Sequence, residues 1–169
     1  EFRRVLFRSV LNDGCIENDG TGSRVKCHAN DLVNVSSAEV CIIGTGNCGS
    51  STDQVSGVTG ATDFPSLISM VAQKDGWYTE LPGTGERVLS RPLVIGGLVL
   101  FSSFSPSAAT GTCGASGESL LYALYYLTGS AYSSPVVGKD TRGGNDYVNR
   151  SASLGSGMAR SEEHTSELQ

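Results

Sequence analysis

Residues 75–129 read DGWYTELPGTGERVLSRPLVIGGLVLFSSFSPSAATGTCGASGESLLYALYYLTG, and they hold nearly all of the strand-forming sequence in the chain. The clearest local signal is a pair of apolar runs, Leu93–Ile95 and Leu98–Phe101, separated by two glycines. The central residues of a tight hairpin need positive φ angles, which Gly96 and Gly97 can adopt without steric cost. This part of the sequence therefore predicts a β-hairpin with a two-glycine turn.

Further short runs lie on both sides of this hairpin. Trp77–Leu81 combines aromatic and β-branched residues and is stopped by a proline and two turn glycines. Glu86–Ser90 is a second run, and Ser119–Tyr126 supplies another that is closed by a Thr-Gly pair. Together they predict four or five short antiparallel strands within about 55 residues, the size of one propeller blade with its neighbour's edge. We expect a mainly β protein, and within it a fragment of a β-propeller.

One segment, near residues 63–74, has helical periodicity instead. Asp63 suits the N-cap position and Pro65 the first turn. Asp75–Gly76 is expected to end the helix. The apolar residues recur at i, i+3, i+4 and i+7 and form one stripe, which consists of Phe64, Leu67, Ile68 and Val71. The sequence predicts a single short structural helix that covers a sheet edge or a gap between blades.

The two ends of the chain match the two strands of one DNA string. Residues 160–169 (RSEEHTSELQ) are the translation of AGATCGGAAGAGCACACGTCTGAACTCCAG, and residues 1–9 (EFRRVLFRS) follow in frame from its reverse complement. The string looks like a sequencing-library adapter, and chance agreement at both ends is negligible. We therefore expect both ends to be adapter-derived and exclude them from the fold; a natural basic N-terminal segment with an acidic tail is the alternative. Residues 10–159 are then expected to be an internal fragment.

The charge balance argues against two classes of partner. The chain has a net charge of −5, and the excess positive charge of residues 1–9 cancels the excess negative charge of residues 160–169. A mildly acidic chain with scattered bases offers no footprint for nucleic acid or for an anionic membrane. No apolar run approaches the roughly 20 residues that span a bilayer. We expect neither a nucleic-acid partner nor a membrane span.

Residues 10–61 are dense in Asn, Asp, Gly and Ser and are expected to form a loop-rich, disulfide-bounded insertion, whereas residues 62–159 form the propeller blade segment. Local disulfides would stabilise the short polar loops in place of a core, and the candidates are Cys15, Cys27, Cys41 and Cys48. A zinc site is the alternative, but there is no Cys-x-x-Cys pair and only one nearby histidine, His28. Cys113 is either free or paired with sequence outside the fragment. Disulfides would place the protein outside the reducing cytoplasm.

Two motifs point to enzymatic sites but lack the required structural context. Gly44-x-Gly46-x-x-Gly49 has the spacing of a dinucleotide-binding loop, yet no helical stripe follows that could present an N-terminus to a pyrophosphate. His28 and Ser116 occur in an order compatible with a serine hydrolase, but the order of residues along the chain does not show that they lie close together in the fold. We expect a glycine-rich, disulfide-bounded loop and a turn serine, with no catalytic, cofactor-binding or metal-binding residue in the fragment.

With these motifs in view, the chain resembles the C-terminal propeller of the PilY family, whose members are tip-associated adhesins and assembly factors of the bacterial type IV pilus. The resemblance rests on GWYTELP at 76–82, GERVLSRPLV at 85–94, GGLVLF at 96–101 and the Leu-Tyr-Ala-Leu…Thr-Gly element at 121–129. The later Tyr-Val-Asn…Leu-Gly-Ser-Gly-Met element at 147–158 fits the following strand and turn, so the resemblance covers roughly residues 62–158. The element at 121–129 is also similar to the blade repeat of quinoprotein dehydrogenases, although Tyr125 stands where that repeat usually has Asp.

The resemblance implies a non-enzymatic role in a cell-surface protein that promotes type IV pilus assembly and adhesion. Its partners would be the remaining propeller blades of the same chain, type IV pilus components and a host or abiotic surface. The protein would be exported through the periplasm and act extracellularly or at the cell surface. The family's calcium loop has aspartates at alternate positions. Since no such run occurs here, calcium is expected only elsewhere in the full-length protein.

The alternative is a fragment of a periplasmic quinoprotein-type dehydrogenase. Such an enzyme needs a tryptophan stacked on the cofactor, charged partners and a metal-ligand set, whereas the single tryptophan here, Trp77, lies in a strand motif. We instead expect a structural core, with faces between blades, formed by Trp77, Leu93, Val94, Leu98, Leu100, Phe101, Leu121, Leu124 and Tyr126. Because one and a half blades cannot close a ring, the isolated fragment is expected to be only marginally stable.

Overall fold

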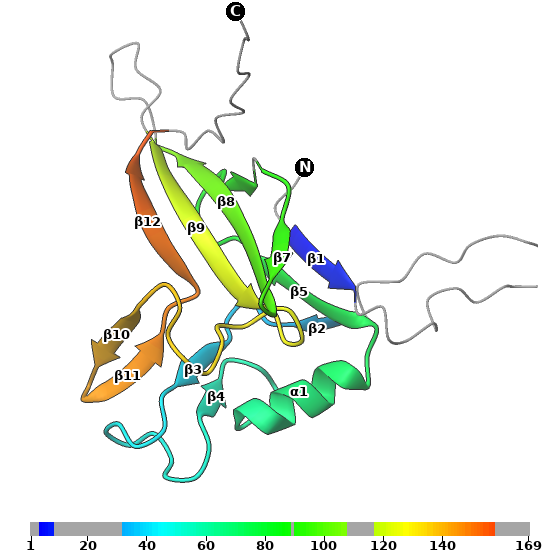
Figure 1. Ribbon diagram of the computed structural model, residues 1–169, viewed down its shortest axis with the longest axis vertical. Coiled ribbons are helices and arrows are strands. Elements are labelled where there is room, and N and C mark those ends of the chain that lie inside the picture. Colours follow the sequence, from blue (N-terminus) through cyan, green and yellow to red (C-terminus); the bar gives the residue numbers. More distant parts are fainter. Residues whose placement is uncertain (1–3, 9–31, 89, 108–116, 158–169) are drawn as a thin grey trace, which may run out of the picture.

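The computed structural model of the chain describes residues 4–8, 32–88, 90–107 and 117–157. Within these residues the fold is mainly β with one helix, as the sequence predicted (Figure 1). The elements are β1 (Arg4–Arg8), β2 (Leu32–Asn34), β3 (Glu39–Cys41), β4 (Gln54–Ser56), α1 (Phe64–Ala72), β5 (Gly76–Glu80), β6 (Arg87–Val88), β7 (Leu93–Ile95), β8 (Leu98–Pro106), β9 (Gly117–Tyr125), β10 (Lys139–Arg142), β11 (Asn145–Val148) and β12 (Ser151–Ser156). Outside the described residues lie Cys15, Cys27, His28, Cys113 and Ser116.

The largest sheet has five antiparallel strands in the order β12-β9-β8-β6, with β7 also paired to β8. Strands β8 and β9 align over their full lengths, from Leu98 opposite Tyr125 to Pro106 opposite Gly117 (Figure 1). Strands β7 and β8 form a hairpin whose turn residues, two glycines, have φ angles of 58° and 82°. The hairpin prediction is therefore confirmed. The sheets in the described part of the chain are open, and the propeller stays a prediction.

Two smaller sheets join segments that are far apart in the sequence. One has the order β1-β5-β2, with β5 antiparallel to β1 and parallel to β2, and the other has the antiparallel order β10-β11-β3-β4. Strands β2, β3 and β4 lie in the segment that was expected to be loop-rich. Each is only three residues long, too short to show a clear alternation in the sequence. The pairing of β2 with β5 and of β3 with β11 ties this segment to residues 62–159.

Strand β1 lies within residues 1–9, which we expect to be adapter-derived. It pairs with β5 from Arg4 opposite Glu80 to Arg8 opposite Gly76. Such pairing uses backbone N–H and C=O groups, which require no particular side chains. The pairing is therefore compatible with an origin outside the natural gene.

Helix α1 begins as the sequence predicted. The backbone N–H of Ser66 donates to the carboxylate of the N-cap residue Asp63 at 2.8 Å, the Ser66 hydroxyl oxygen accepts from the Asp63 N–H at 3.1 Å, and Pro65 occupies the first turn. The apolar stripe faces inward, and its buried residues are Phe64, Leu67 and Val71. The helix ends earlier than expected, at Ala72, because the chain turns into β5, which Gly76 begins with a φ of 144°.

Alternation along β8 decides which of its residues face the core. Val99, Phe101 and Ser103 are buried, whereas Leu98 and Leu100 point to the opposite face and are half-buried. The sequence analysis placed both leucines in the core. Because this strand is apolar on both faces, a period of two does not by itself reveal which face is buried.

The remaining core candidates divide in the same way. Those that the structure buries are Trp77, Phe101 and Leu124, and those that it half-buries are Leu121 and Tyr126. Leu93 and Val94 depart from the expected core position, since 58% and 51% of their surfaces are exposed. They lie in β7, a three-residue strand that pairs with β8, and the exposure of all three of its residues shows that neither of its faces is covered in the described part of the chain.

The tryptophan of β5 and the glycine turn after β9 pack as one unit. The indole Nε1 of Trp77 donates to the carbonyl oxygen of Tyr126 at 2.8 Å. Gly129 lies against the indole ring with a φ of 67°, and a Cβ at this position would lie 2.2 Å from two ring carbons. The GWYTELP motif and the Thr-Gly element are therefore joined by direct contact.

We predict that Gly129→Ala destabilises the protein far more than Gly143→Ala. Both glycines have positive φ angles, 67° and 61°, so both substitutions carry a backbone cost of about 1 kcal/mol. An added Cβ on Gly143 meets nothing within 4 Å, whereas one on Gly129 must displace Trp77, and such overpacking adds about 1–3 kcal/mol. Urea denaturation of the two variants measures the difference in unfolding free energy. Equal losses would contradict the packing of Trp77 on the turn.

The loop between β3 and β4 is closed by a disulfide between Cys41 and Cys48, whose Cα atoms are 5.7 Å apart. This bond confirms one of the two expected local disulfides. Inside the loop, Gly44 and Gly46 have φ angles of 78° and 47°. The chain then continues to β4 rather than into a helix. The Gly-x-Gly-x-x-Gly spacing therefore belongs to a closed turn, in line with the expectation of a glycine-rich, disulfide-bounded loop.

Removal of this disulfide in a Cys41→Ser/Cys48→Ser double variant is expected to lower the unfolding free energy by roughly 2–3 kcal/mol, because the unfolded chain without the bond has more conformational entropy than the cross-linked one. Hydrogen exchange should accelerate at the β3 and β4 amides and stay unchanged along the β8–β9 pair. Ser50→Ala, in the same loop but outside the bond, is the control. A double variant as stable as the parent protein would contradict a stabilising role for the bond.

Candidate functional site

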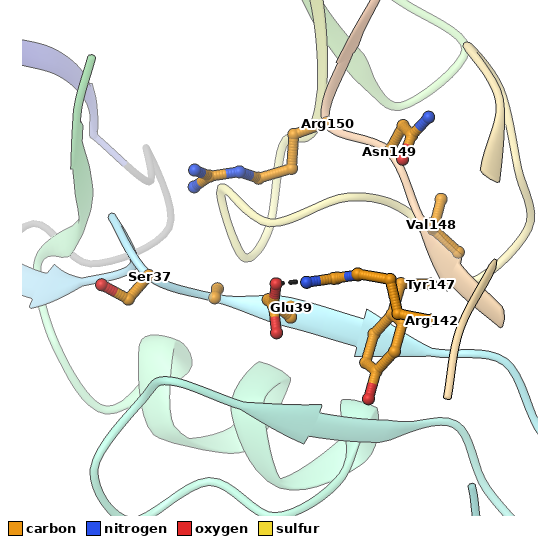
Figure 2. Close-up of a pocket in the computed structure, with 8 residues that line it drawn as sticks. Ser37, Glu39, Arg142, Tyr147, Val148, Asn149 and Arg150 are labelled. Atoms are coloured by element: carbon orange, nitrogen blue, oxygen red, sulfur yellow. Dashed lines mark hydrogen bonds and ion pairs between the residues drawn. The ribbon is translucent and has the colours of Figure 1, made fainter. Parts of the chain in front are cut away.

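An open cleft of about 470 Å³ lies where the β2–β3 connection meets the β10–β11 hairpin and the start of β12 (Figure 2). Its polar lining consists of Ser37, Glu39, Arg142, Tyr147, Asn149 and Arg150. These side chains come from two segments, 37–39 and 142–150. The pairing of β3 with β11, which sets Val40 opposite Val148, brings the two segments together.

The β10–β11 hairpin is shaped by its turn and by cross-strand polar contacts. Gly143 and Gly144 have φ angles of 61° and 81°, as a tight two-residue turn requires. Lys139 and Thr141 of β10 both donate to the carboxylate of Asp146 on β11, at 2.5 and 2.6 Å. The Lys139 hydrogen bond in particular lowers the pKa of Asp146. These contacts hold the hairpin beside β3.

Arg142 forms the outer wall of the cleft, and nearby carboxylates compensate its charge. Its Nη2 donates to Oε1 of Glu39 at 2.8 Å, and its Nε lies 3.2 Å from Oδ2 of Asp140. The hydrogen bond to Glu39 raises the pKa of Arg142. The guanidinium carbon also lies 4.2 Å from the ring centroid of Tyr147. Exposed pairs of this kind contribute little to stability because solvent screens them, so they shape the cleft more than they stabilise the fold.

Arg150 forms the inner wall, between β11 and β12, and its charge is not compensated in the same way. Its Nη1 donates to the carbonyl oxygen of Val35 at 3.1 Å and to the hydroxyl oxygen of Thr79 at 3.4 Å. Among the described residues, no carboxylate lies within ion-pair distance of this guanidinium. Burial lowers the pKa of Arg150. The inner wall therefore presents a partly desolvated cation that has only neutral hydrogen-bond acceptors.

The remaining donors of Arg150 keep access to solvent. A guanidinium carries five N–H donors, and within the described chain only Nη1 has protein partners. No buried side-chain nitrogen or oxygen in that part of the chain lacks a hydrogen-bond partner, so Nε and Nη2 must be accessible to water. The Ser37 hydroxyl and the Asn149 amide also line the cleft.

A second polar cluster lies inside the main sheet, where Glu86 is only 1% exposed. Its Oε1 accepts hydrogen bonds from the Ser103 hydroxyl at 2.5 Å and the Tyr122 hydroxyl at 2.9 Å, and its Oε2 accepts from the backbone N–H of Gly83 at 2.8 Å. Burial and the charge of Glu86 raise the pKa of Tyr122. The carboxylate therefore joins the turn before β6 to both β8 and β9.

Sequence reasoning singled out neither the cleft nor this cluster. Glu39, Arg142 and Arg150 belong to no motif, and their proximity depends on strand pairing between segments about 100 positions apart. Glu86 does lie in the GERVLS motif, but a glutamate beside a glycine turn is ordinarily a surface residue. A buried carboxylate is visible only once the three strands that surround it are known.

Comparison with known proteins found no match to a protein family, to a curated protein or to a solved structure. Within the described ranges, no three His, Cys, Asp or Glu side chains gather in a way that could hold a metal ion. No described helix has the length and apolar character needed to cross a membrane.

We predict that Tyr122→Phe lowers the unfolding free energy at neutral pH by about 1–3 kcal/mol, because buried Glu86 loses a hydrogen-bond donor. The variant should also change how the unfolding free energy depends on pH in the alkaline range. The pKa of Tyr122 in the folded protein is raised above the ordinary value of 10.0, so above that pH the unfolded chain releases the proton first. The stability of the parent protein therefore falls as the pH rises further, by up to about 1.4 kcal/mol per pH unit.

Urea denaturation at a series of alkaline pH values measures this effect. The loss of stability with pH should be shallower in Tyr122→Phe than in the parent protein. Tyr132→Phe, at a ring that is 38% exposed, is the control and should keep the full loss. An unchanged slope in Tyr122→Phe would show that this hydroxyl titrates freely and does not depend on Glu86.

Proposed function

We propose that the chain is a non-enzymatic part of a cell-surface protein of type IV pilus assembly and adhesion, to which it contributes blades of a β-propeller. Three observations support the proposal. The sequence motifs resemble the PilY propeller, the fold is mainly β, and the Cys41–Cys48 disulfide is compatible with an extracellular or periplasmic location. The partners proposed are the remaining blades of the same chain, pilus components and a host or abiotic surface.

The main observation that supports the proposal is an apolar face of the sheet. Directly opposed residues of antiparallel strands point to the same face, and the β7–β8 register sets Leu93 opposite Leu100 and Ile95 opposite Leu98. These four residues form a stripe on the face opposite to the buried side of β8, and Leu93 and Ile95 are each 58% exposed. Blade sheets of a propeller pack face against face. A neighbouring blade would bury this stripe.

Long-read sequencing through both adapter junctions tests the assignment by recovering the intact gene. The proposal expects a signal peptide, an integrin-like domain with metal-binding serines upstream, and an aspartate-rich loop in the propeller. A set of regular blade repeats with a quinone-stacking tryptophan and a calcium ligand set would replace it with the dehydrogenase alternative. Native coding of residues 1–9 and 160–169 would show that these segments belong to the protein.

The same gene allows a direct test of blade packing. In the full-length protein Leu93→Asn should lower the unfolding free energy by about 2 kcal/mol, the cost of losing a buried leucine side chain, and should lower Tm accordingly. In the present chain the loss should stay below about 0.5 kcal/mol, as at other exposed positions. Val136→Asn, 49% exposed and outside the stripe, should have a small effect in both proteins. Equally small effects of Leu93→Asn in both would contradict burial by a neighbouring blade.

A further inference from the structure

We propose that the cleft of Figure 2 binds the carboxylate of an acidic sugar, which the guanidinium of Arg150 holds through two parallel hydrogen bonds. Tyr147 and Asn149 of the lining belong to a motif that resembles the pilus propeller, whereas Ser37 and Glu39 do not. The inference uses none of the pilus roles proposed above, so it does not rest on the proposed function and can fail or succeed independently of it.

The first argument is the incompletely compensated charge of Arg150, whose pKa burial lowers although the charges of Glu39 and Glu86 act in the opposite direction. Removing a guanidinium partly from water costs free energy unless its charge is paired. Arg142, on the outer wall, has the carboxylates of Glu39 and Asp140 within 3.2 Å. Arg150 has only a carbonyl and a hydroxyl oxygen as acceptors. An anion that enters the cleft would add a direct ion-pair partner for this guanidinium.

The second argument is the geometry of the free donors. The contacts of Nη1 with Val35 and Thr79 fix the orientation of the planar guanidinium of Arg150. The Nε and Nη2 donors then lie side by side on another edge, a fork that matches the two oxygens of a carboxylate. Because the protein has already ordered this side chain, a ligand loses less conformational entropy on binding.

The third argument is the charge around the cleft, which favours a monoanion over a dianion. Arg142 is paired with Glu39 and Asp140, so Arg150 is the lining cation that has no ion-pair partner among the described residues, on a chain whose total charge is −5. A carboxylate places one negative charge beside this cation. A phosphate dianion would place a second negative charge near Glu39, which costs free energy at short distance.

The fourth argument concerns the groups around the guanidinium. In Figure 2 the Arg150 guanidinium extends toward the Ser37 end of the cleft, whereas Arg142 folds back onto Glu39. The hydroxyl of Ser37 and the amide of Asn149 both donate and accept hydrogen bonds, as sugar hydroxyls do. The carboxylate of an acidic peptide comes on a methylene stem, and only two of the eight lining residues, Ala38 and Val148, are aliphatic and could pack against it. The observations therefore favour an acidic sugar over an acidic peptide.

An NMR titration of the chain tests the site with glucuronate as the probe. The Nε–H resonance of Arg150 should shift saturably with glucuronate and more weakly with acetate. Glucose, which has the hydroxyls but no carboxylate, should leave it unchanged. Tighter binding of a capped glutamate peptide than of glucuronate would overturn the sugar assignment. Absence of a saturable shift with every carboxylate would overturn the site.

Two variants address the role of Arg150. Arg150→Lys keeps the charge but loses the fork and should weaken glucuronate binding by about tenfold or more, as expected for a charge-assisted pair. Arg91→Gln, at an exposed arginine that does not line the cleft, is the control and should bind as the parent protein does.

Since Arg150 also contacts Val35 and Thr79, its substitution can unfold the protein, and a second position keeps the test decisive. Ser37 is exposed, and Ser37→Asp places a carboxylate at the mouth of the cleft. This variant should fold normally and lose binding by about tenfold or more, because its own charge pairs with Arg150. Ser37→Asn, similar in size but neutral, should retain binding. Equal affinities of the two Ser37 variants would contradict the proposal.

Discussion

The carboxylate of Glu86 in the core constrains the geometry of the main sheet. A buried carboxylate without hydrogen bonds costs several kcal/mol, and both oxygens of Glu86 are satisfied, by the backbone of Gly83 and by the hydroxyls of Ser103 and Tyr122. These donors come from the turn before β6, from β8 and from β9. A shift of either long strand by one residue would reverse its faces and leave the carboxylate unpaired. The polar cluster therefore specifies the register that the apolar residues of β8 leave open.

A short series of contacts connects this strand register to the position of Arg150 in the cleft. Tyr122 is stacked on Phe101, with the ring centroids 4.9 Å apart, and the next residue, Ala123, donates its backbone N–H to the carbonyl oxygen of Arg150 at 2.9 Å. The main chain of Arg150 is thereby fixed to β9, while its side chain reaches Val35 and the strand β5. The inner wall of the cleft is thus an extension of the core packing, whereas the outer wall is held by exposed ion pairs on the β10–β11 hairpin.

The features that could be predicted are those that depend on residues close together in the sequence. The turn at Gly96–Gly97, the N-cap at Asp63 and the Cys41–Cys48 bond each depend on residues within a few positions of one another, and the structure has all three. The strand of residues 98–101 was predicted, but its buried face was not, because both faces are apolar. The cleft depends on β3 pairing with β11, two short strands from distant segments. No periodicity over three or four residues reveals such a pairing.

The residues that carry the sequence resemblance are largely packing residues. Trp77 rests on Gly129, Glu86 takes its hydrogen bonds from Gly83 and two strands, and Gly96 and Gly97 form a hairpin turn. A resemblance based on such residues is evidence about the fold, since the same fold can carry different sites. The cleft is built instead from residues 37–39 and 142–150, on connections and a projecting hairpin, and of these only 147–149 belong to a motif of the resemblance. Such connections on a rigid scaffold are where binding groups usually lie, so what this protein recognises is expected to depend on Arg150 and its surroundings rather than on the packing residues of the main sheet.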